Sequence, residues 1–268
     1  MPLRIVQSRQ NARVKELRAA LQRPSRDPAE LIGLEGLHLV QEAAQSGLKL
    51  TTVFVAQGYE SLLQQLNLPA SVELLAVPPD VLASSVTTEA PQPIAALAQP
   101  PSWTWQSILA PQALLVVLAG LQDPGNLGTI LRSAEAFGAC GVIALPGTVS
   151  PWNPKAMRAS AGSVFRLPLL QVSEEECFSR LRAARIQTIA AMPHQASPLA
   201  EYALHYPTAL VIGSEGSGIP ATVASRCTAR VTIPTPGPVE SLNAAVAASV
   251  LLYEASRQRS LSDKGPAQ

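Results

Sequence analysis

The chain has 268 residues, 47% of them hydrophobic and 15% charged, a globular composition that excludes a disordered chain. Its net charge of +1 gives by itself no indication of a nucleic-acid partner. The longest apolar runs, such as residues 113–119, are too short to span a bilayer, and the N-terminus shows no signal peptide, so we expect a cytoplasmic protein with no membrane partner.

The first part of the chain alternates helical and strand patterns. Residues 11–21 have helical spacing, with Val14, Leu17 and Leu21 on one face. Two more helices are expected at residues 36–45 and 61–66, and two strands at residues 52–55 and 72–77. We therefore expect residues 1–95 to form one α/β domain.

A proline-rich segment follows at residues 91–111. It contains five prolines, at positions 91, 93, 100, 101 and 111, and two tryptophans, Trp103 and Trp105. Proline lacks a backbone N–H and fixes φ, so this density disfavours helices and strands. We therefore expect a linker at residues 96–112 and a second domain at residues 113–268.

The second domain has a clearer pattern. Residues 113–119 are typical of a buried parallel strand, and residues 127–137 have helical spacing, with Gly138 at the position of a C-cap glycine. A long helix is expected at residues 243–259. The further strand candidates are residues 141–145, 186–190, 209–212 and 231–233. Strands alternating with helices predict a mostly parallel sheet covered on both faces.

Basic residues are concentrated near the N-terminus. Residues 1–26 carry seven arginines or lysines and one acid, Glu16. Two interpretations stay open, a surface that faces phosphate groups and a solvated helix face. Under the first, the side chains expected to contact RNA are Arg9, Arg13, Lys15 and Arg18.

The first segment that indicates chemistry is residues 121–138. A Pro-Gly turn follows a buried strand, Asn126 stands at the expected helix start, and Arg132 follows within the helix. Asparagine at that place can cap free backbone N–H groups. The alternative is an ordinary strand–turn–helix unit with a solvent-facing arginine.

The second segment, residues 210–220, sets glycines around Glu215 after an apolar strand. Glycines there allow a sharp turn and the close approach of a ligand. The P-loop lysine is missing, and the spacing of Gly213, Gly216 and Gly218 differs from the dinucleotide-binding fingerprint. A phosphate cradle is therefore disfavoured.

The third segment, residues 233–259, leads through a proline-glycine loop to Ser241-Leu242-Asn243 and an alanine-rich helix. We expect Ser241 to cap this helix. The alanines allow close packing, which suits an interface between subunits.

Together and in this order, the three segments closely resemble the motifs of the SpoU (TrmH) family of RNA ribose 2′-O-methyltransferases, in the SPOUT superfamily. Asn126-x-Gly128-x-x-x-Arg132 resembles the first motif, Gly213-x-Glu215-Gly216-x-Gly218 the second and Ser241-Leu242-Asn243 the third. Residues 152–168 and the N-terminal segments SRQNARVKELR and GLEGLHLVQEA are also similar to the family. One departure is Ala244-Ala245, where the family commonly has Val-Ser.

The resemblance implies an α/β fold whose C-terminal, mostly parallel sheet holds a trefoil knot. It also implies a smaller N-terminal α/β domain, similar to a ribosomal protein, that binds the RNA substrate. S-adenosylmethionine is the implied cofactor and a homodimer the implied assembly. A ribose 2′-hydroxyl of structured RNA is the implied methyl acceptor, with ribosomal RNA preferred over transfer RNA because of the N-terminal domain.

The resemblance also assigns residues. It points to Arg132 as the catalytic residue; because a guanidinium stays protonated, we expect Arg132 to grip the target phosphate and orient the 2′-hydroxyl. The other candidate catalytic residues are Asn126, Glu215, Ser241 and Asn243. The residues expected to bind the cofactor are Ala191, Met192, Ile212, Gly213, Glu215, Gly218, Ile233, Leu242 and Asn243. Lys155 and Arg158 are further candidate RNA contacts.

No metal is expected, because three separated cysteines and three histidines (Cys140, Cys177, Cys227, His38, His194, His205) show no ligand spacing. Three alternatives are an inactive RNA-binding protein of the same fold, a tRNA-directed 2′-O-methyltransferase, and a nucleotide or NAD enzyme. The intact motif residues count against the first, and the missing phosphate fingerprints against the third.

Overall fold

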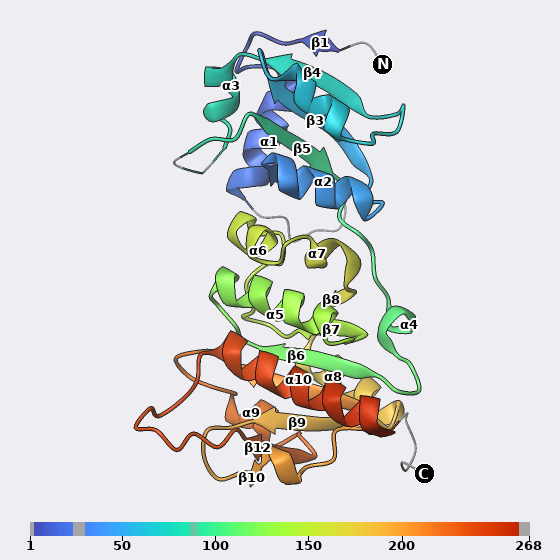
Figure 1. Cartoon of the computed structure of the whole chain (residues 1–268), viewed down its shortest axis with the longest axis vertical. Coiled ribbons are helices and arrows are strands. Elements are labelled where there is room, and N and C mark those ends of the chain that lie inside the picture. The colour runs from blue at the N-terminus through green and yellow to red at the C-terminus, as the bar shows by residue number, and fades with distance from the viewer. Residues whose placement is uncertain (1–2, 24–29, 87, 89, 263–268) are drawn as a thin grey trace. The chain divides into compact units, whose positions relative to one another are not determined.

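The computed structural model describes residues 3–23, 30–86, 88 and 90–262. The chain forms two compact units, residues 1–102 with 150–166 and residues 103–149 with 167–268 (Figure 1). Each unit has its own β-sheet and its own buried core. No helix among the described residues is long and apolar enough to cross a membrane.

The first unit is built on a five-stranded mixed sheet with the order β1-β4-β3-β5-β2. β1 and β3 run parallel to β4, whereas β5 pairs antiparallel with β3 and β2. The strands are β1 (Arg4–Ile5), β2 (Ile32–Glu35), β3 (Leu50–Ala56), β4 (Glu73–Val77) and β5 (Ile94–Ala98). The expected strands at 52–55 and 72–77 are thus confirmed within longer or slightly shifted bounds.

Helix α1 (Ala12–Gln22) confirms the helical spacing of the N-terminal segment. Asn11 caps it, accepting from the backbone N–H of Arg13, and Val14, Leu17 and Leu21 are buried. They join a core cluster with residues of β3, β4 and β5, so the apolar face of α1 covers the sheet. The other helices of this unit are α2 (Leu37–Gln45), the 3₁₀ helix η1 (Glu60–Gln65), α3 (Pro79–Ala83), α6 (Pro154–Ala159) and α7 (Ser163–Arg166).

Residues 150–166 pack with the first unit although they follow β7 of the second unit in the chain. Arg166 Nη1 donates to Glu42 Oε2 of α2 at 2.7 Å. Gly162 has a φ of +86°, and a β-carbon there would lie 2.4 Å from Glu42 Oε2. Residues 150–166 therefore belong to the first compact unit, although chain order placed them in the expected second domain, residues 113–268.

The proline-rich segment is more regular than expected. β5 is fully buried and paired on both sides, and the prolines stand before it and after it rather than within it. Helix α4 (Trp105–Ile108) follows, with a capping box formed by Thr104 and Ser107. The expectation that proline density prevents strands and helices here was wrong, because only prolines at paired positions remove a ladder hydrogen bond.

The second unit contains a seven-stranded sheet with the order β10-β12-β9-β11-β6-β7-β8, and all paired neighbours run parallel. The expected mostly parallel sheet is therefore confirmed. β11 (Thr208–Gly213) lies between β6 (Leu114–Ala119) and β9 (Gln187–Ala191). The other strands are β7 (Gly141–Ala144), β8 (Leu169–Gln171), β10 (Ser197–Pro198) and β12 (Ala229–Thr232). Strand order does not test the trefoil knot, which stays a prediction.

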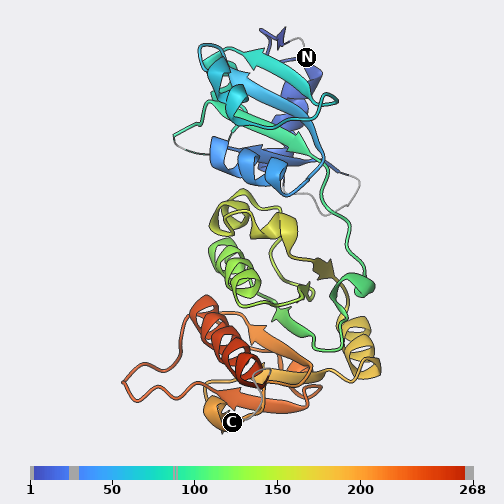
Figure 2. The same cartoon turned by 45° about the vertical axis from the view of Figure 1, so that its right-hand side comes forward.

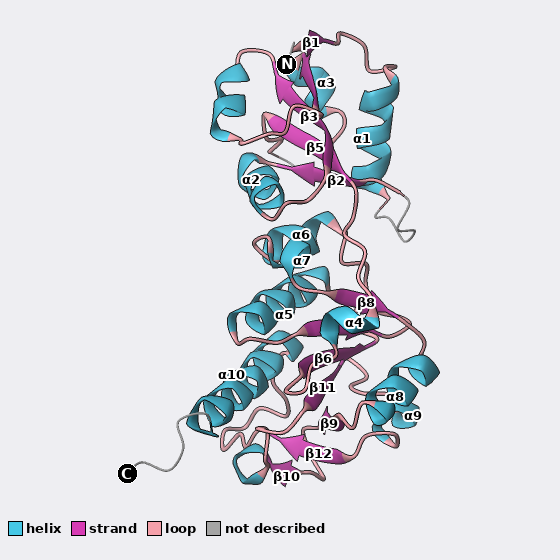
Figure 3. Cartoon of the chain, turned by 90° about the vertical axis from the view of Figure 1, so that its right-hand side faces the viewer, coloured by secondary structure: helices cyan, strands magenta, loops and turns pink. Residues whose placement is uncertain are grey.

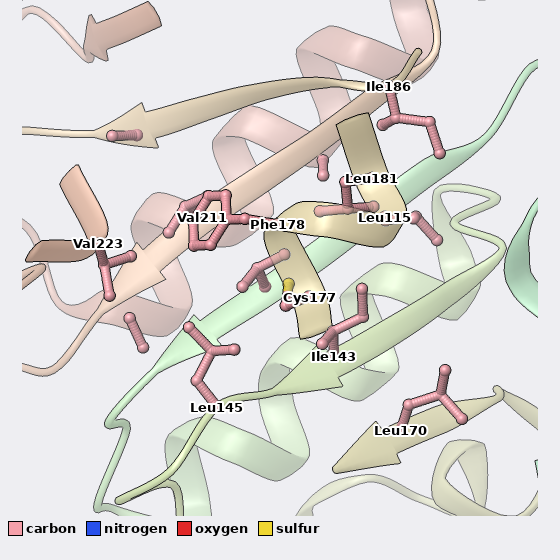
Figure 4. Packing of buried hydrophobic residues seen from close by; sticks show 14 of the residues in the cluster. Leu115, Ile143, Leu145, Leu170, Cys177, Phe178, Leu181, Ile186, Val211 and Val223 are labelled. Atoms are coloured by element: carbon pink, nitrogen blue, oxygen red, sulfur yellow. The ribbon is translucent and has the colours of Figure 1, made fainter. Parts of the chain in front are cut away.

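Helices cover both faces of this parallel sheet (Figure 3). On one face lie α5 (Pro124–Ala136) and α10 (Ala244–Ser262), which pack against each other. On the other lie α4, α8 (Glu174–Ala183) and α9 (Ala221–Ala224), with the short η2 (Leu199–Glu201) elsewhere in the unit. Leu115 and Val211 of the sheet pack with Phe178 and Leu181 of α8 in one buried cluster (Figure 4).

Helix α5 ends as the sequence predicts. Gly138 has a φ of +76°, and the backbone N–H of Ala139 donates to the carbonyl of Ala134 at 2.8 Å. Glycine adopts this left-handed conformation without the steric cost of a β-carbon. The turn directs the chain from α5 into β7.

Candidate active site

The three motif segments meet at one edge of the parallel sheet. The first motif follows β6, the second follows β11, and the third lies between β12 and α10. The carboxyl ends of parallel strands share one edge of a sheet, which is where α/β proteins bind ligands. Figure 2 shows the segment 233–243 before α10 as a long loop without helix or strand.

Asn126 joins the other two motifs. Its Nδ2 donates a hydrogen bond to Oε1 of Glu215, and its Oδ1 accepts one from Nδ2 of Asn243 at 3.1 Å. A carboxylate only accepts hydrogen bonds, so Glu215 determines which way the Asn126 amide faces. The direction of the hydrogen bonds Glu215–Asn126–Asn243 therefore agrees with the charge of Glu215 at one end.

Asp123, not Asn126, caps helix α5, so the expectation of a capping role for Asn126 was wrong. Oδ1 of Asp123 accepts from the backbone N–H of Asn126 at 2.7 Å, and Pro124 occupies the first turn. Proline is favoured in the first turn because its fixed φ suits a helix, which moves the helix start ahead of Asn126. The Asn126 side chain is therefore available to bridge the other motifs.

Asn243, not Ser241, caps helix α10, which corrects a second expectation. Its Oδ1 accepts from the backbone N–H groups of Ala245 at 2.9 Å and Val246 at 3.2 Å. Asn243 thus satisfies two N–H groups at the helix start while its Nδ2 reaches Asn126. Ser241 is exposed and stands in the loop before the helix.

The glycine loop of the second motif closes on itself. The backbone groups of Ser214 and Gly218 exchange two hydrogen bonds of 3.1 and 3.0 Å. A β-carbon on Gly213 would lie 2.2 Å from the carbonyl carbon of Gly218, so only glycine fits. Gly218 has a φ of +65°, which also favours glycine. The closed loop holds Glu215 at an exposed position, where it meets Asn126.

A pocket of about 390 Å³ lies at the carboxyl ends of β9, β11 and β12 and against the start of α10. Eight of the nine residues expected to bind the cofactor line it, namely Ala191, Met192, Ile212, Gly213, Glu215, Gly218, Ile233 and Leu242. The ninth, Asn243, does not line the pocket, but both of its chain neighbours do. Ser241 also lines the pocket. The second and the third motif therefore both contribute residues to one cavity.

Several lining residues were not among those expected. Pro193, Thr235 and Glu240 lie in loops, and Ala247 lies one turn into α10. The spacing of Ala247 from Asn243 is the one signal that could have indicated it, since residues four apart share a helix face. The loop residues carry no periodic signal.

The alanines of α10 face inward. Ala244, Ala245 and Ala248 are buried, with exposures of 7%, 3% and 0%. Ser249 Oγ lies 2.7 Å from Ser133 Oγ, which fixes α10 against α5. The expectation that these alanines form a subunit interface was therefore wrong, because the close packing they allow is within the unit.

Arg132 stands apart from the bridged motif residues. It lies on α5, is exposed, and its guanidinium has no hydrogen-bond or ion-pair partner in the described part of the chain. The structure thus brings Asn126, Glu215 and Asn243 together and leaves the charge of Arg132 available to a ligand.

All six residues expected to contact RNA belong to the first unit, and acids of that unit pair with some of them. Arg9 bonds Asp80 at 2.7 Å, and Arg13 bonds Glu16 at 2.8 Å and Glu73 at 3.0 Å. The Arg9 hydrogen bond lowers the pKa of Asp80, and the Glu16 hydrogen bond raises the pKa of Arg13. These exposed pairs are weak, so the arginines can exchange partners at little cost.

The other RNA candidates differ in their surroundings. Arg18 donates to the carbonyl oxygen and to Oγ of Ser84, both at 3.2 Å. Lys15 is exposed and its side chain has no partner among the residues that the structure describes. Lys155 and Arg158 are exposed on α6. Lys15 therefore offers the clearest test of the basic surface.

Cys177 and Cys227 are poor ligands and poor nucleophiles. Burial raises the pKa of Cys177 to about 12 and that of Cys227 to about 11, so both thiols stay protonated near neutral pH. No group of three or more histidine, cysteine or acidic side chains within the described residues could hold a metal ion.

Comparison with known proteins identifies the family of the chain. Residues 113–253 match the SpoU rRNA Methylase family, and residues 11–96 match the MRM3-like substrate binding domain. A Synechocystis sp. protein named as an uncharacterized tRNA/rRNA methyltransferase is 37% identical over 95% of this chain and 94% of its own. The 23S rRNA (guanosine(2553)-2′-O)-methyltransferase RlmP of Bacillus subtilis is 29% identical over 92% and 97%.

A solved structure shows the same fold. The SpoU methyltransferase AviRb from Streptomyces viridochromogenes, in complex with the cofactor AdoMet, superposes with a TM-score of 0.84 at 31% identity over 93% of this chain and 98% of that chain. The predicted fold class, a C-terminal parallel-sheet domain with a smaller N-terminal substrate-binding domain, is confirmed. The chain belongs to the SpoU family of RNA methylases, as its three motifs predict.

Proposed function

We propose that this protein transfers the methyl group of S-adenosylmethionine to a ribose 2′-hydroxyl of ribosomal RNA. Membership of the family supports an RNA methyltransferase, and relatives named 23S rRNA 2′-O-methyltransferases support the substrate. The observation that carries the proposal is the hydrogen-bonded chain Glu215–Asn126–Asn243 beside the pocket at the sheet edge.

The charges of the pocket fit a cationic cofactor. Among the described residues that line it there is no lysine or arginine, whereas Glu215 and Glu240 are carboxylates. S-adenosylmethionine carries a sulfonium, an ammonium and a carboxylate group and is a net cation, which carboxylates attract, whereas NAD and nucleotides carry phosphates, which they repel. The pocket volume of about 390 Å³ lies within the range of small-molecule sites. These charges count against the NAD alternative.

The pocket walls suit the uncharged parts of the same cofactor. Met192, Ile212 and Leu242 offer apolar surface, and Gly218, which has no side chain and no atom within 4 Å of where a β-carbon would stand, lets a ligand come close to the loop. The bound cofactor supplies an activated methyl group on sulfur. The residues of the pocket bind and orient it so that the methyl faces the RNA.

The residues around the pocket contribute mainly by positioning. Methyl transfer from sulfur to oxygen is an in-line displacement, so the acceptor oxygen must lie opposite the sulfur, and correct placement supplies much of the rate. Asn126 and Asn243 fix the loop that carries Glu215. Arg132, exposed and unpaired among the described residues, is proposed to hold the phosphate next to the target ribose.

The first unit is proposed to bind the RNA. Its match to a substrate binding domain and its exposed basic side chains, among them Lys15 and Arg158, support this role. The functional division into residues 1–95 for RNA, 96–112 as a connection and 113–268 for catalysis is part of the proposal, as are the knot and a cytoplasmic location.

A homodimer formed through the second unit is also proposed. Val246, Val250 and Tyr253 lie three or four residues apart along α10 and are exposed by 50%, 36% and 56%. An apolar stripe of this kind on a helix is a common interface feature. A monomeric mass by light scattering at micromolar concentration would refute the dimer.

The function is tested with purified protein, labelled S-adenosylmethionine, and ribosomal or transfer RNA from a strain that lacks the gene. We expect label in ribosomal RNA, at a nucleotide that becomes resistant to alkaline cleavage. Label only in transfer RNA would favour the tRNA-directed alternative. Binding of the cofactor without transfer to either RNA would favour the inactive RNA-binding protein.

A further inference from the structure

A second pocket in the catalytic unit lies away from the cofactor pocket. It has a volume of about 300 Å³ and is lined by the start of β9, the residues before β12 and the end of α8. Gln187 and Thr188 of β9 line this pocket, with Ile186 just before the strand, whereas Ala191 at the other end of the same strand lines the cofactor pocket. The two pockets therefore lie at opposite edges of the parallel sheet.

Three arginines line the second pocket, namely Arg182, Arg185 and Arg226. The side chains of Arg182 and Arg185 are exposed and have no hydrogen-bond or ion-pair partner in the described ranges of the chain. Arg226 bonds Glu175 and lies over the ring of Phe178, with its guanidinium carbon 5.7 Å from the ring centroid. Three arginines against one carboxylate leave a net positive charge of two.

The other polar groups of this pocket are already satisfied. Thr228 Oγ1 donates to the carbonyl of Thr188 at 2.8 Å, and Gln187 Nε2 bonds Ala203 and Thr208. Phe178 and Ile186 belong to the buried cluster below (Figure 4). The donors left for a ligand are thus the guanidinium groups, whose planar geometry matches phosphate oxygens.

The backbone conformation at Arg185 is one that favours glycine rather than arginine. Arg185 follows the end of α8 with a φ of +55°, and the N–H of Ile186 donates to the carbonyl of Leu181. Gly138 occupies the equivalent position after α5, with the same hydrogen-bond pattern. Glycine suits this conformation best, and residues in sparsely populated backbone conformations cluster at functional sites.

We propose that Arg182, Arg185 and Arg226 form a phosphate-binding site at the sheet edge opposite the cofactor pocket. Its ligand carries phosphate groups, either as the backbone of an RNA strand or as a free phosphate compound. Such a site gives the catalytic unit a second contact with phosphate that is separate from Arg132 and from the first unit.

The test compares two double variants that each remove two arginines. Arg182→Ala with Arg185→Ala empties the proposed site. Arg180→Ala with Arg230→Ala is the control, because both residues are exposed in the same unit and neither lines the pocket. The probes are an RNA hairpin, titrated at several salt concentrations, and sodium pyrophosphate, followed by thermal shift. S-adenosylmethionine binding should be equal in all proteins.

If RNA occupies the site, the first double variant lowers the slope of log affinity against log salt by about two, and the control does not. If a free phosphate compound occupies it, RNA binding is unchanged but the thermal shift with pyrophosphate is lost in the first variant only. Either result supports the site. Equal effects of the two double variants, or no effect of either, would overturn it.

The single variant Arg185→Gly provides a check that does not require the double variant to fold. Because glycine suits a φ of +55°, the variant should melt at or above the wild-type temperature while its phosphate response weakens. A clear fall in the melting temperature would show that Arg185 is kept for structure, and would also count against the proposal.

Discussion

Asn243 donates from Nδ2 to Oδ1 of Asn126, 117 residues earlier in the chain, at a distance of 3.1 Å. The same Asn243 caps helix α10 and the same Asn126 holds Glu215, so two asparagines connect all three motifs. Any change that reverses one amide disturbs the positions of the others, because each amide presents one donor side and one acceptor side.

Asn126→Asp should therefore impair catalysis, although the two side chains have nearly the same size. The aspartate cannot donate to Glu215 and places a second negative charge beside it. Loss of a hydrogen bond to a charged group costs about 1.5–3 kcal/mol, so we expect a loss of roughly 10- to 100-fold in kcat/KM. Thr129→Ala, an exposed change on the same helix, is the control. Normal turnover by Asn126→Asp would show that the bridge has no catalytic role.

The glycine loop allows a matched pair of substitutions. Gly213→Ala places a β-carbon 2.2 Å from the backbone of Gly218, whereas Gly216→Ala meets no atom within 4 Å. We expect Gly213→Ala to open the loop and lower the affinity for S-adenosylmethionine at least about tenfold, and Gly216→Ala to change it little. Calorimetry with both variants checks this. Equal affinities would mean that the loop does not shape the cofactor site.

The sequence predicted the helices and strands that have a clear pattern of apolar residues. The apolar run at 113–119 became β6, and the spacing at 11–21 became α1. It did not predict β5, because proline density over a segment does not say which positions are paired. Nor did it indicate that β11 enters between β6 and β9, since the order of strands depends on contacts between distant parts of the chain.

The sequence predicted which residues belong to the candidate site better than it predicted the hydrogen bonds between them. The family motifs named Asn126, Glu215 and Asn243, and the shared edge of parallel strands explains why they meet. Their hydrogen bonds could not be predicted, because Asp123 takes the capping role that Asn126 was expected to have. The cap residue depends on where the helix starts, and boundaries are the least certain part of a pattern.

If the basic side chains of the first unit contact RNA, their removal should reduce the salt dependence of RNA binding. Lys15→Ala removes a side chain with no partner among the described residues, whereas Arg13→Ala also frees Glu16 and Glu73. If Lys15 contacts phosphate, its loss lowers the salt slope by about one. The change at Arg13 should weaken RNA binding further, because Glu16 then loses its ion pair with Arg13 and Glu73 keeps only the one with Arg4. An unchanged slope in both variants would identify a solvated helix face.

Alkaline pH should destabilise the second unit through its buried thiols. Burial raises the pKa of Cys177 to about 12 and that of Cys227 to about 11, whereas an exposed thiol in the unfolded chain titrates near pH 8.5. Above that pH the unfolded chain loses protons that the folded chain retains, so the free energy of unfolding falls as pH rises. Each thiol contributes at most about 1.4 kcal/mol per pH unit.

Denaturant titrations at about pH 8 and pH 10 measure this effect. Cys177→Ala should lower the free energy of unfolding at both pH values, because it leaves a small cavity, but it should reduce the difference between them. Cys140→Ala, at a half-buried position, is the control. A pH dependence that is the same in wild type and Cys177→Ala would assign alkaline lability to other groups.

Arg132 should serve the chemical step rather than the fold. It is exposed on α5 and has no partner among the described residues, so Arg132→Ala should leave the melting temperature and the affinity for S-adenosylmethionine nearly unchanged. If it holds the target phosphate, its loss should lower single-turnover methylation at least about 100-fold. Arg132→Lys should restore little, because an ammonium cannot make the planar two-pronged contact of a guanidinium. Near-normal single-turnover rates for Arg132→Ala at saturating RNA would leave Arg132 as a surface arginine and move the orienting role to another cation.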